Sequence, residues 1–116
     1  MEARTAMNVR EPTPGLRVID IEGEITAFSE GVFSEAFSQA SSGDVKAVAL
    51  NFADLEYMNS GGIGLLVTML IRAQRNNQKL AAYGLNDHYR QILSLTRLDE
   101  AIEIHPDEDA IKATLS

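Results

Sequence analysis

The residues best placed to do chemistry lie where an apolar, strand-like run gives way to a polar pair and closely spaced glycines. Residues 57–67 read Tyr-Met-Asn-Ser-Gly-Gly-Ile-Gly-Leu-Leu-Val, and Ser60 is the hydroxyl residue at the turn. The preceding run, Ala47 to Phe52, is apolar apart from Asn51, as expected of a strand covered on both faces. The following run has apolar residues at helical spacing. Ser60 is therefore expected at a helix N-terminus, where unpaired N–H groups and the helix dipole favour a hydroxyl oxygen or a phosphate.

The hydroxyl of Ser60 has two interpretations. Serine is a favoured helix cap and glycine suits tight turns, so Ser60 can be purely structural. A phosphate on Ser60 would instead add about −1.5 to −2 charges, and docking of a partner would weaken by repulsion and desolvation. Gly61, Gly62 and Gly64 leave the backbone bare beside the hydroxyl, which predicts close approach by another protein.

Enzymatic readings of the same segment are weaker. The run Gly61-Gly62-Ile63-Gly64 lacks the P-loop spacing and its lysine, so nucleotide hydrolysis is not expected, although nucleotide binding by bare amides stays open. Position 58 is Met rather than the Gly of a nucleophile elbow. His88 and His105 are the candidate bases and are interpreted as surface residues. No catalytic residue, cofactor or metal site is predicted.

Length and composition describe one ordinary globular domain. The chain has 116 residues, which predicts a single domain spanning residues 1–116. No apolar run approaches the roughly 20 residues that cross a bilayer, so membrane insertion is not expected. Cysteine is absent and the first residues lack the apolar core of a signal peptide, which together predict a cytoplasmic protein.

The charge balance is acidic, with 17 acidic and 10 basic residues and a net charge of −7. This charge repels phosphate backbones, so direct nucleic-acid binding is not expected. The acidity is densest near the C-terminus, where a solvated face is favoured over a docking patch for a basic partner. The acidic residues there are Asp99, Glu100, Glu103, Asp107, Glu108 and Asp109.

Periodicity predicts an opening hairpin followed by alternating helices and strands. A short strand near Asn8 precedes breaks at Pro12 and Pro14 and a second strand from Leu16 to Ile21. Further strands are expected over 45–52, 79–83 and 102–104, and helices over 28–40, 61–76, 87–96 and 106–115. Asn51 and Asp54 are expected to satisfy loop backbone near a strand end. This order predicts an α/β fold with a mixed, mostly parallel four- to five-stranded sheet and helices packed against it.

Four segments carry a resemblance to a known family. They are Ile21-Glu22-Gly23-Glu24-Ile25, the run from Tyr57 to Gly64, Leu80-Ala81-Ala82-Tyr83-Gly84, and Leu95-Thr96-Arg97-Leu98. Together with the order of elements they resemble the STAS domain, as found in bacterial anti-sigma factor antagonists, over nearly the whole chain. The resemblance implies a regulatory binding module rather than an enzyme.

The resemblance also implies a partner and a switch. In the family, a serine or threonine in the stretch matching Ser60-Gly61 is commonly phosphorylated by a serine kinase of the histidine-kinase-like ATPase type, which is also the anti-sigma factor. The unphosphorylated domain binds this partner and frees a sigma factor. A phosphatase and a homodimer are compatible with this reading. The alternative is a STAS subunit of another complex, for lipid transport or signalling, in which Ser60 is only structural.

This sequence departs from the family pattern at three positions. Asn59 stands where the family usually has Asp, and Thr26 stands at another usual Asp. Asn59 can accept a capping hydrogen bond but cannot help hold a kinase-bound metal. Gly61 replaces the second hydroxyl of the family's pair, so Ser60 is the only acceptor left in the motif.

The helix after Ser60 predicts a docking face. At about 100° per residue, the core side would comprise Ile63, Leu66, Val67, Leu70 and Gln74. Leu65, Met69 and Arg72 would lie on the opposite, exposed side, with Thr68 as a polar rim. The predicted partner-binding residues are therefore Asn59, Ser60, Gly61, Gly62, Ile63, Gly64, Leu65, Thr68, Met69 and Arg72. Cover by a neighbouring helix is the alternative for Leu65 and Met69.

Overall fold

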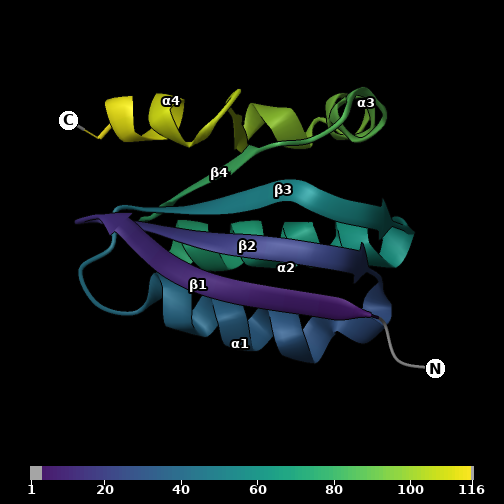
Figure 1. Cartoon of the computed structure of the whole chain (residues 1–116), viewed down its shortest axis with the longest axis horizontal. Helices are drawn as coiled ribbons and strands as arrows, with labels where there is room; N and C mark the ends of the chain where they lie inside the picture. Colours follow the sequence, from purple (N-terminus) through teal and green to yellow (C-terminus); the bar gives the residue numbers. More distant parts are fainter. Residues whose placement is uncertain (1–3, 116) are drawn as a thin grey trace.

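Five strands form one sheet in the order β1-β2-β3-β4-β5 (Figure 1). A computed structural model describes residues 4–115. Strands β1 (Thr5–Thr13) and β2 (Leu16–Ile25) pair antiparallel as a hairpin, and β3 (Ala47–Met58), β4 (Lys79–Tyr83) and β5 (Glu103–Ile104) follow in parallel. The predicted fold class, a mixed and mostly parallel sheet that starts with a hairpin, is confirmed.

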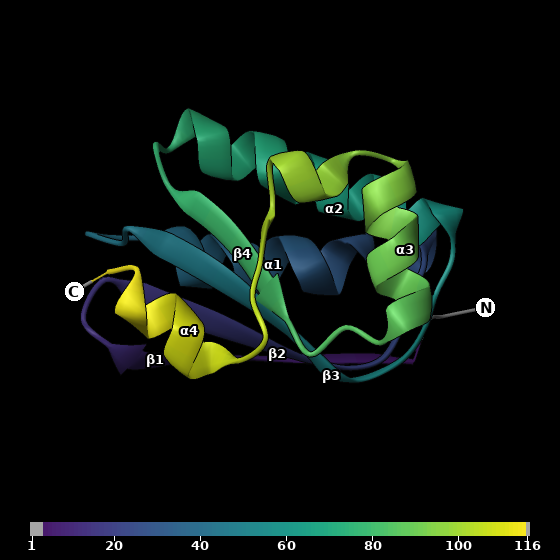
Figure 2. The ribbon, with the colours of Figure 1, turned by 90° about the horizontal axis from the view of Figure 1, so that it is seen from above.

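The helices cover the two faces of this sheet unequally. They are η1 (Ala27–Ser29), α1 (Glu30–Ser41), α2 (Ser60–Arg75), α3 (Asp87–Leu95), η2 (Leu98–Glu100) and α4 (Glu108–Ala113). Helices α1, α2 and α3 lie on one face, and the short α4 lies on the other, as Figure 2 shows. The last helix begins later than predicted, because Asp107 caps it by accepting a hydrogen bond from the Ala110 N–H, which leaves Pro106 outside the first turn.

Strand β3 is longer than its sequence pattern predicts. It continues six residues past Phe52 to Met58 and stays paired with β2 through Glu22 and Asp54 and through Ile25 and Met58. The pairing register shifts between these two pairs, so the inside-outside alternation is interrupted and the pattern is hard to recognise. This extension carries the chain to the start of α2.

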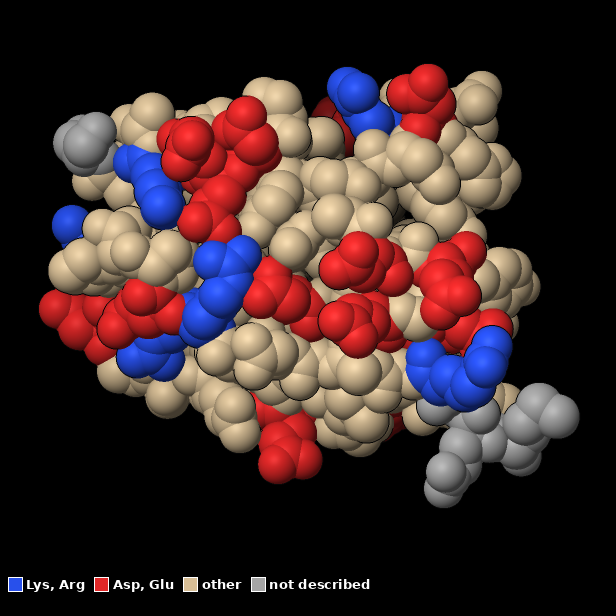
Figure 3. Space-filling view, in the orientation of Figure 1, with Lys and Arg blue, Asp and Glu red and all other residues tan. Residues whose placement is uncertain are grey.

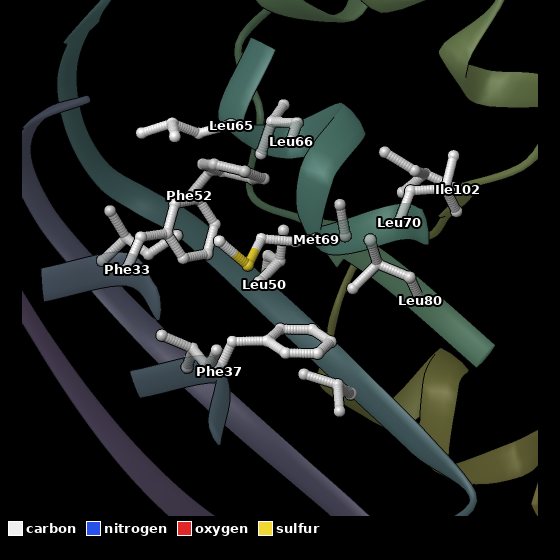
Figure 4. Close-up of a cluster of buried hydrophobic side chains, with 14 of the residues drawn as sticks. Phe33, Phe37, Leu50, Phe52, Leu65, Leu66, Met69, Leu70, Leu80 and Ile102 are labelled. Atoms are coloured by element: carbon white, nitrogen blue, oxygen red, sulfur yellow. The ribbon is translucent and has the colours of Figure 1, made fainter. Parts of the chain in front are cut away.

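The main core lies between the sheet and helices α1, α2 and α3. Figure 4 shows Leu65 and Met69 of α2 pointing into this core beside Phe33, Phe37 and Phe52. The predicted exposure of Leu65 and Met69 is therefore wrong, since these side chains are 7% and 1% exposed. The alternative of cover by neighbouring elements is the correct one.

The buried stripe of α2 follows a regular three-and-four spacing that includes two small residues. It consists of Gly62, Leu65, Leu66, Met69, Leu70 and Ala73. Val67 and Gln74, predicted on the core side, are exposed instead. The sequence-based prediction placed the buried stripe about one residue too far toward the C-terminus. The reason is that Gly62 and Ala73 contribute little to an apolar pattern, although both are buried.

A smaller apolar cluster lies under α4 on the opposite face of the sheet. Ile111 of α4 packs there against side chains of β2, β3 and β4, namely Leu16, Val18, Ala47, Ala49, Ala81 and Tyr83. The cover on both faces explains why β3 begins with the continuously apolar run Ala47 to Leu50. Within residues 4–115 no helix is both long and apolar enough to cross a membrane.

A polar network fastens α4 to the sheet. The Arg10 guanidinium lies 2.6 Å from a carboxylate oxygen of Asp20 and 2.6 Å from one of Glu108, and it donates to the Tyr83 hydroxyl at 3.1 Å. Asn51 donates to Asp20 at 2.8 Å and accepts from the Ala53 N–H. Hydrogen bonds from Arg10 hold the pKa of Asp20 and of Glu108 below their usual values, while burial and the Glu108 charge raise the pKa of Tyr83 to about 12.

Candidate functional site

Ser60 is the first residue of α2 and is exposed. The cap of this helix is Asn59, whose side-chain oxygen accepts the Gly62 N–H at 3.0 Å. The interpretation of Ser60 as the cap is therefore wrong, and the capping role expected for Asn59 is confirmed. In the part of the chain that the structure describes, the Ser60 hydroxyl makes no hydrogen bond. It is free to react or to be contacted.

The strand end before Ser60 is held from two sides. The Met58 N–H donates to the buried Tyr89 hydroxyl of α3 at 2.9 Å, and the Asn59 N–H donates to the Ile25 carbonyl of β2 at 3.3 Å. These bonds join α3, β2 and β3 at one point. The backbone that presents Ser60 is fixed by buried contacts even though its side chain is exposed.

Two of the three glycines serve internal packing rather than access for a partner. A Cβ on Gly62 would collide with the Ile25 carbonyl oxygen, and one on Gly61 would lie 2.9 Å from the Ala27 nitrogen. Only Gly64 is exposed with open space around it. The expectation that all three leave bare, accessible backbone is correct for Gly64 alone.

The turn η1 lies directly against the start of α2, through the contact of Ala27 with Gly61. Thr26 caps η1 by accepting the Phe28 N–H at 3.1 Å, and the Ser29 hydroxyl accepts the Thr26 N–H at 3.0 Å. Thr26 therefore fulfils a local structural role at the position where the family usually has Asp. Phe28, two residues after Thr26 in the same turn, is exposed.

The remaining predicted docking residues divide between surface and interior. Thr68 is exposed and Ile63 is half-buried, so both remain candidates for partner contact. Arg72 instead ties α2 to α1: it donates to the Ser34 and Ser38 hydroxyls at 3.1 and 2.9 Å, and its guanidinium carbon lies 4.9 Å from the Phe37 ring centroid. Arg72 is therefore engaged within the molecule.

The structure exposes a different set of apolar side chains from the predicted one. Phe28 is 71% exposed and Val32, one turn later on α1, is 42% exposed. Val67 and Ile71 are exposed on α2. The sequence pattern predicted that a helix begins at Phe28 and that Val67 lies on the core side of the helix after Ser60. Thr26 and Ser29 form a capping pattern that ends before Phe33. This pattern is the sequence signal that would have placed Phe28 in a turn outside the core.

Other candidate residues lie in structural pairs. His105 lies 3.2 Å from a carboxylate oxygen of Glu103, and the exposed His88 packs edge-on against Tyr89. Among the hydrogen bonds of residues 4–115, none joins Ser60 to a histidine. Over the same residues, no group of three histidine and carboxylate side chains is arranged to hold a metal ion.

The sheet face that α4 leaves open is strongly acidic. Figure 3 shows carboxylates gathered over this face. Glu22 and Asp54 are exposed and lie at paired positions of β2 and β3. Asp54 is exposed within β3, which corrects its expected place in a loop. Of the acidic C-terminal residues, Glu108 is not simply solvated, because it pairs with Arg10 and Lys112.

The hairpin, the parallel strands and the capped helix start together define an α/β domain with a SpoIIAA-like fold. The sequence profile of the STAS domain family matches residues 7–111. The chain belongs to the STAS domain family.

Known proteins similar to this chain include anti-sigma factor antagonists. An anti-sigma-B factor antagonist of Listeria monocytogenes is 26% identical over 86 residues, 74% of this chain and 75% of the relative. The crystal structure of an anti-sigma factor antagonist from Mycobacterium paratuberculosis has a TM-score of 0.80 at 18% identity, with both chains fully covered.

The antagonist SpoIIAA has a similar structure in two states. Its unphosphorylated form has a TM-score of 0.75 at 19% identity, covering 96% of this chain and 99% of that one. Its phosphorylated form, described as a Bacillus cell fate determinant, has a TM-score of 0.67 at 21% identity and covers 94% and 99%. The predicted resemblance to anti-sigma factor antagonists is confirmed.

Proposed function

We propose that this chain is an anti-sigma factor antagonist: a cytoplasmic binding module that sequesters an anti-sigma factor with serine-kinase activity and is switched by phosphorylation at Ser60. The module itself performs no catalysis. The similar proteins in Listeria and Mycobacterium support the antagonist role. The observation that carries the switch is the exposed, unengaged Ser60 hydroxyl on a rigidly held helix start.

A phosphate on Ser60 would alter docking more than folding. The first turn of α2 carries the positive end of a 16-residue helix, where negative charge is favourable. The modified domain would therefore keep its fold. The added charge of about −1.5 to −2 would oppose a partner that approaches the Phe28 and Ser60 surface. That SpoIIAA has both a phosphorylated and an unphosphorylated form supports a switch of this kind.

The substitutions at Asn59 and Gly61 define the main rival. Asn59 offers a cap but no carboxylate, and the close contact of Gly61 with Ala27 leaves no room for a second hydroxyl. A STAS subunit that binds its partner permanently, without a phosphate switch, would have the same features. Phosphorylation of Ser60 in cells distinguishes the two.

The first test is intact-protein mass spectrometry of the chain purified from its native cells, with peptide mapping across Ser60 and co-purified proteins identified. We expect a phosphate on Ser60, its loss in Ser60→Ala, and recovery of a serine kinase of the histidine-kinase-like ATPase type with the unmodified chain. Binding of that purified kinase should weaken at least about 30-fold in Ser60→Asp, the scale of a lost interface hot spot. Ser94→Asp, at an exposed serine of α3, is the matched control and should bind normally.

The outcomes separate the candidate functions. An unmodified Ser60 under all growth conditions, with kinase binding indifferent to Ser60→Asp, leaves an antagonist without a switch. Co-purification of membrane-complex subunits in place of a kinase would overturn the antagonist role and favour a STAS subunit of another assembly.

A further inference from the structure

Phe28 is the least expected residue on the surface. An aromatic side chain contributes strongly to stability when buried, yet Phe28 is 71% exposed, whereas Phe33 and Phe37 on the following helix are fully buried. The main core therefore does not use the Phe28 ring, although two other phenylalanines nearby reach it.

The turn that carries Phe28 is rigid. Thr26 and Ser29 form a reciprocal capping box around it, and the Phe28 N–H is itself bonded to Thr26. The Ser29 hydroxyl is 1% exposed and also lies 2.7 Å from the Thr5 hydroxyl of β1, which in turn donates to the Glu24 carbonyl. A buried polar network thus fixes η1 to the hairpin. The exposed ring is presented from a firmly anchored backbone.

The same turn is continuous with the Ser60 site. Ala27, directly before Phe28, packs on Gly61, directly after Ser60. Val32 lies four residues beyond Phe28 and extends the exposed apolar surface along α1. Phe28 and Ser60 therefore each lie one residue from the contact that joins the two segments, so a partner covering the start of α2 can reach both the apolar ring and the hydroxyl that would carry the phosphate charge.

We propose that Phe28 is the affinity- and specificity-determining anchor of this surface, and that it inserts into an apolar pocket of the anti-sigma kinase. This inference rests on the proposed function, since it names the contact that this partner makes. Rigid aromatic side chains are typical interface hot spots, because they bury a large area at a small cost in side-chain entropy. Phosphate on Ser60 would weaken binding by placing charge beside this apolar contact.

The test measures binding of the purified kinase that co-purifies with the native chain, by titration calorimetry, to wild type, Phe28→Ser, Phe28→Leu and Leu95→Ser. Leu95 is the matched control, since it is 76% exposed and lies on α3. We expect Phe28→Ser to raise Kd at least about 30-fold, Phe28→Leu to retain most of the affinity, and Leu95→Ser to bind as wild type. Thermal unfolding of Phe28→Ser should match wild type, because an exposed ring adds little to stability.

Failure of this inference differs from failure of the proposed function. Kinase binding that is unchanged in Phe28→Ser, or equally weakened in Leu95→Ser, overturns the anchor and leaves the antagonist role in place. A wild-type chain that binds no kinase overturns both.

Discussion

At the scale of single residues, the shape of the candidate site depends on glycines, which have no side chain. Gly62 allows α2 to approach the end of β2, and Gly61 allows η1 to approach the start of α2. The contact of Ala27 with Gly61 links the segments that carry the exposed Phe28 and Ser60. The loss of the family's second hydroxyl at position 61 is thus matched by a packed contact with Ala27, which a sequence pattern does not reveal.

Substitution by alanine should change the stability of the domain in opposite directions at two glycines of α2, Gly62 and Gly64. Gly62→Ala places a methyl group against the Ile25 carbonyl and Met58, so we expect a loss of about 1–3 kcal/mol in the free energy of unfolding. Gly64→Ala is the matched control, because its added Cβ meets open space, and it should stabilise by about 0.5–1 kcal/mol through helix propensity. Urea denaturation of both variants measures this. Equal effects of the two substitutions would contradict the packing role assigned to Gly62.

At the scale of helices and strands, the sequence predicts the order of elements well. Strand β4 matches its predicted range, and α2 and α3 differ from theirs by at most one residue at each end, because their periodicity is long and glycine or asparagine marks their limits. What the sequence does not predict is which side of α2 is covered. That depends on α1, which packs against the side of α2 that carries Leu65 and Met69. Arg72 of α2 joins the two helices through its hydrogen bond to α1.

The candidate site is less predictable than the fold for the same reason. Asn59 and Ser60 are found from local cap and turn chemistry, which acts over three residues. The neighbourhood of Phe28 depends on Thr5, which is 24 residues from Ser29 along the chain. Contacts across such separations leave no periodic signal. The Thr26 and Ser29 capping pattern can indicate the turn that carries Phe28, but the contacts that anchor this turn are recognised only in the folded molecule.

The attachment of α4 should depend on pH through Arg10. Its guanidinium holds the pKa values of Asp20 and Glu108 below their ordinary range, so these carboxylates stabilise the fold fully above about pH 5, and the stabilisation is lost as pH falls through their lowered values. We expect Arg10→Gln to cost about 1 kcal/mol at pH 7 and progressively less in acid. Free energies of unfolding, measured with denaturant from about pH 2.5 to about pH 7, test this prediction, because that range includes the titration of carboxylates.

Arg97→Gln is the control for this experiment. Arg97 pairs with Glu100 at the surface, and both side chains are more than half exposed, so its loss should change stability less. A difference between wild type and Arg10→Gln that stays constant down to the lowest pH would show that the pairs with Asp20 and Glu108 do not stabilise the fold.

At the scale of the whole molecule, one sheet separates two cores of unequal size. Three helices cover the main core, which holds Phe33, Phe37, Leu66 and Met69 among its fully buried side chains. The opposite cluster is closed by the six-residue α4, in which Ile111 is the buried residue. A helix this short has little stability of its own, so packing of Ile111 and the polar network with Arg10 hold it in place.

Unequal cores predict unequal local stability. Amide groups of α4 should exchange with solvent by an opening that leaves the main core folded, at a free energy several kcal/mol below that of global unfolding, which is about 5–15 kcal/mol for single domains. Amides of Leu66 and Met69 in α2 should exchange only by global unfolding. Hydrogen exchange followed by NMR measures both, and Arg10→Gln should lower protection in α4 selectively. Equal exchange free energies in α4 and α2 would mean that the two cores unfold together, and that the short helix is an integral part of the domain that presents Ser60.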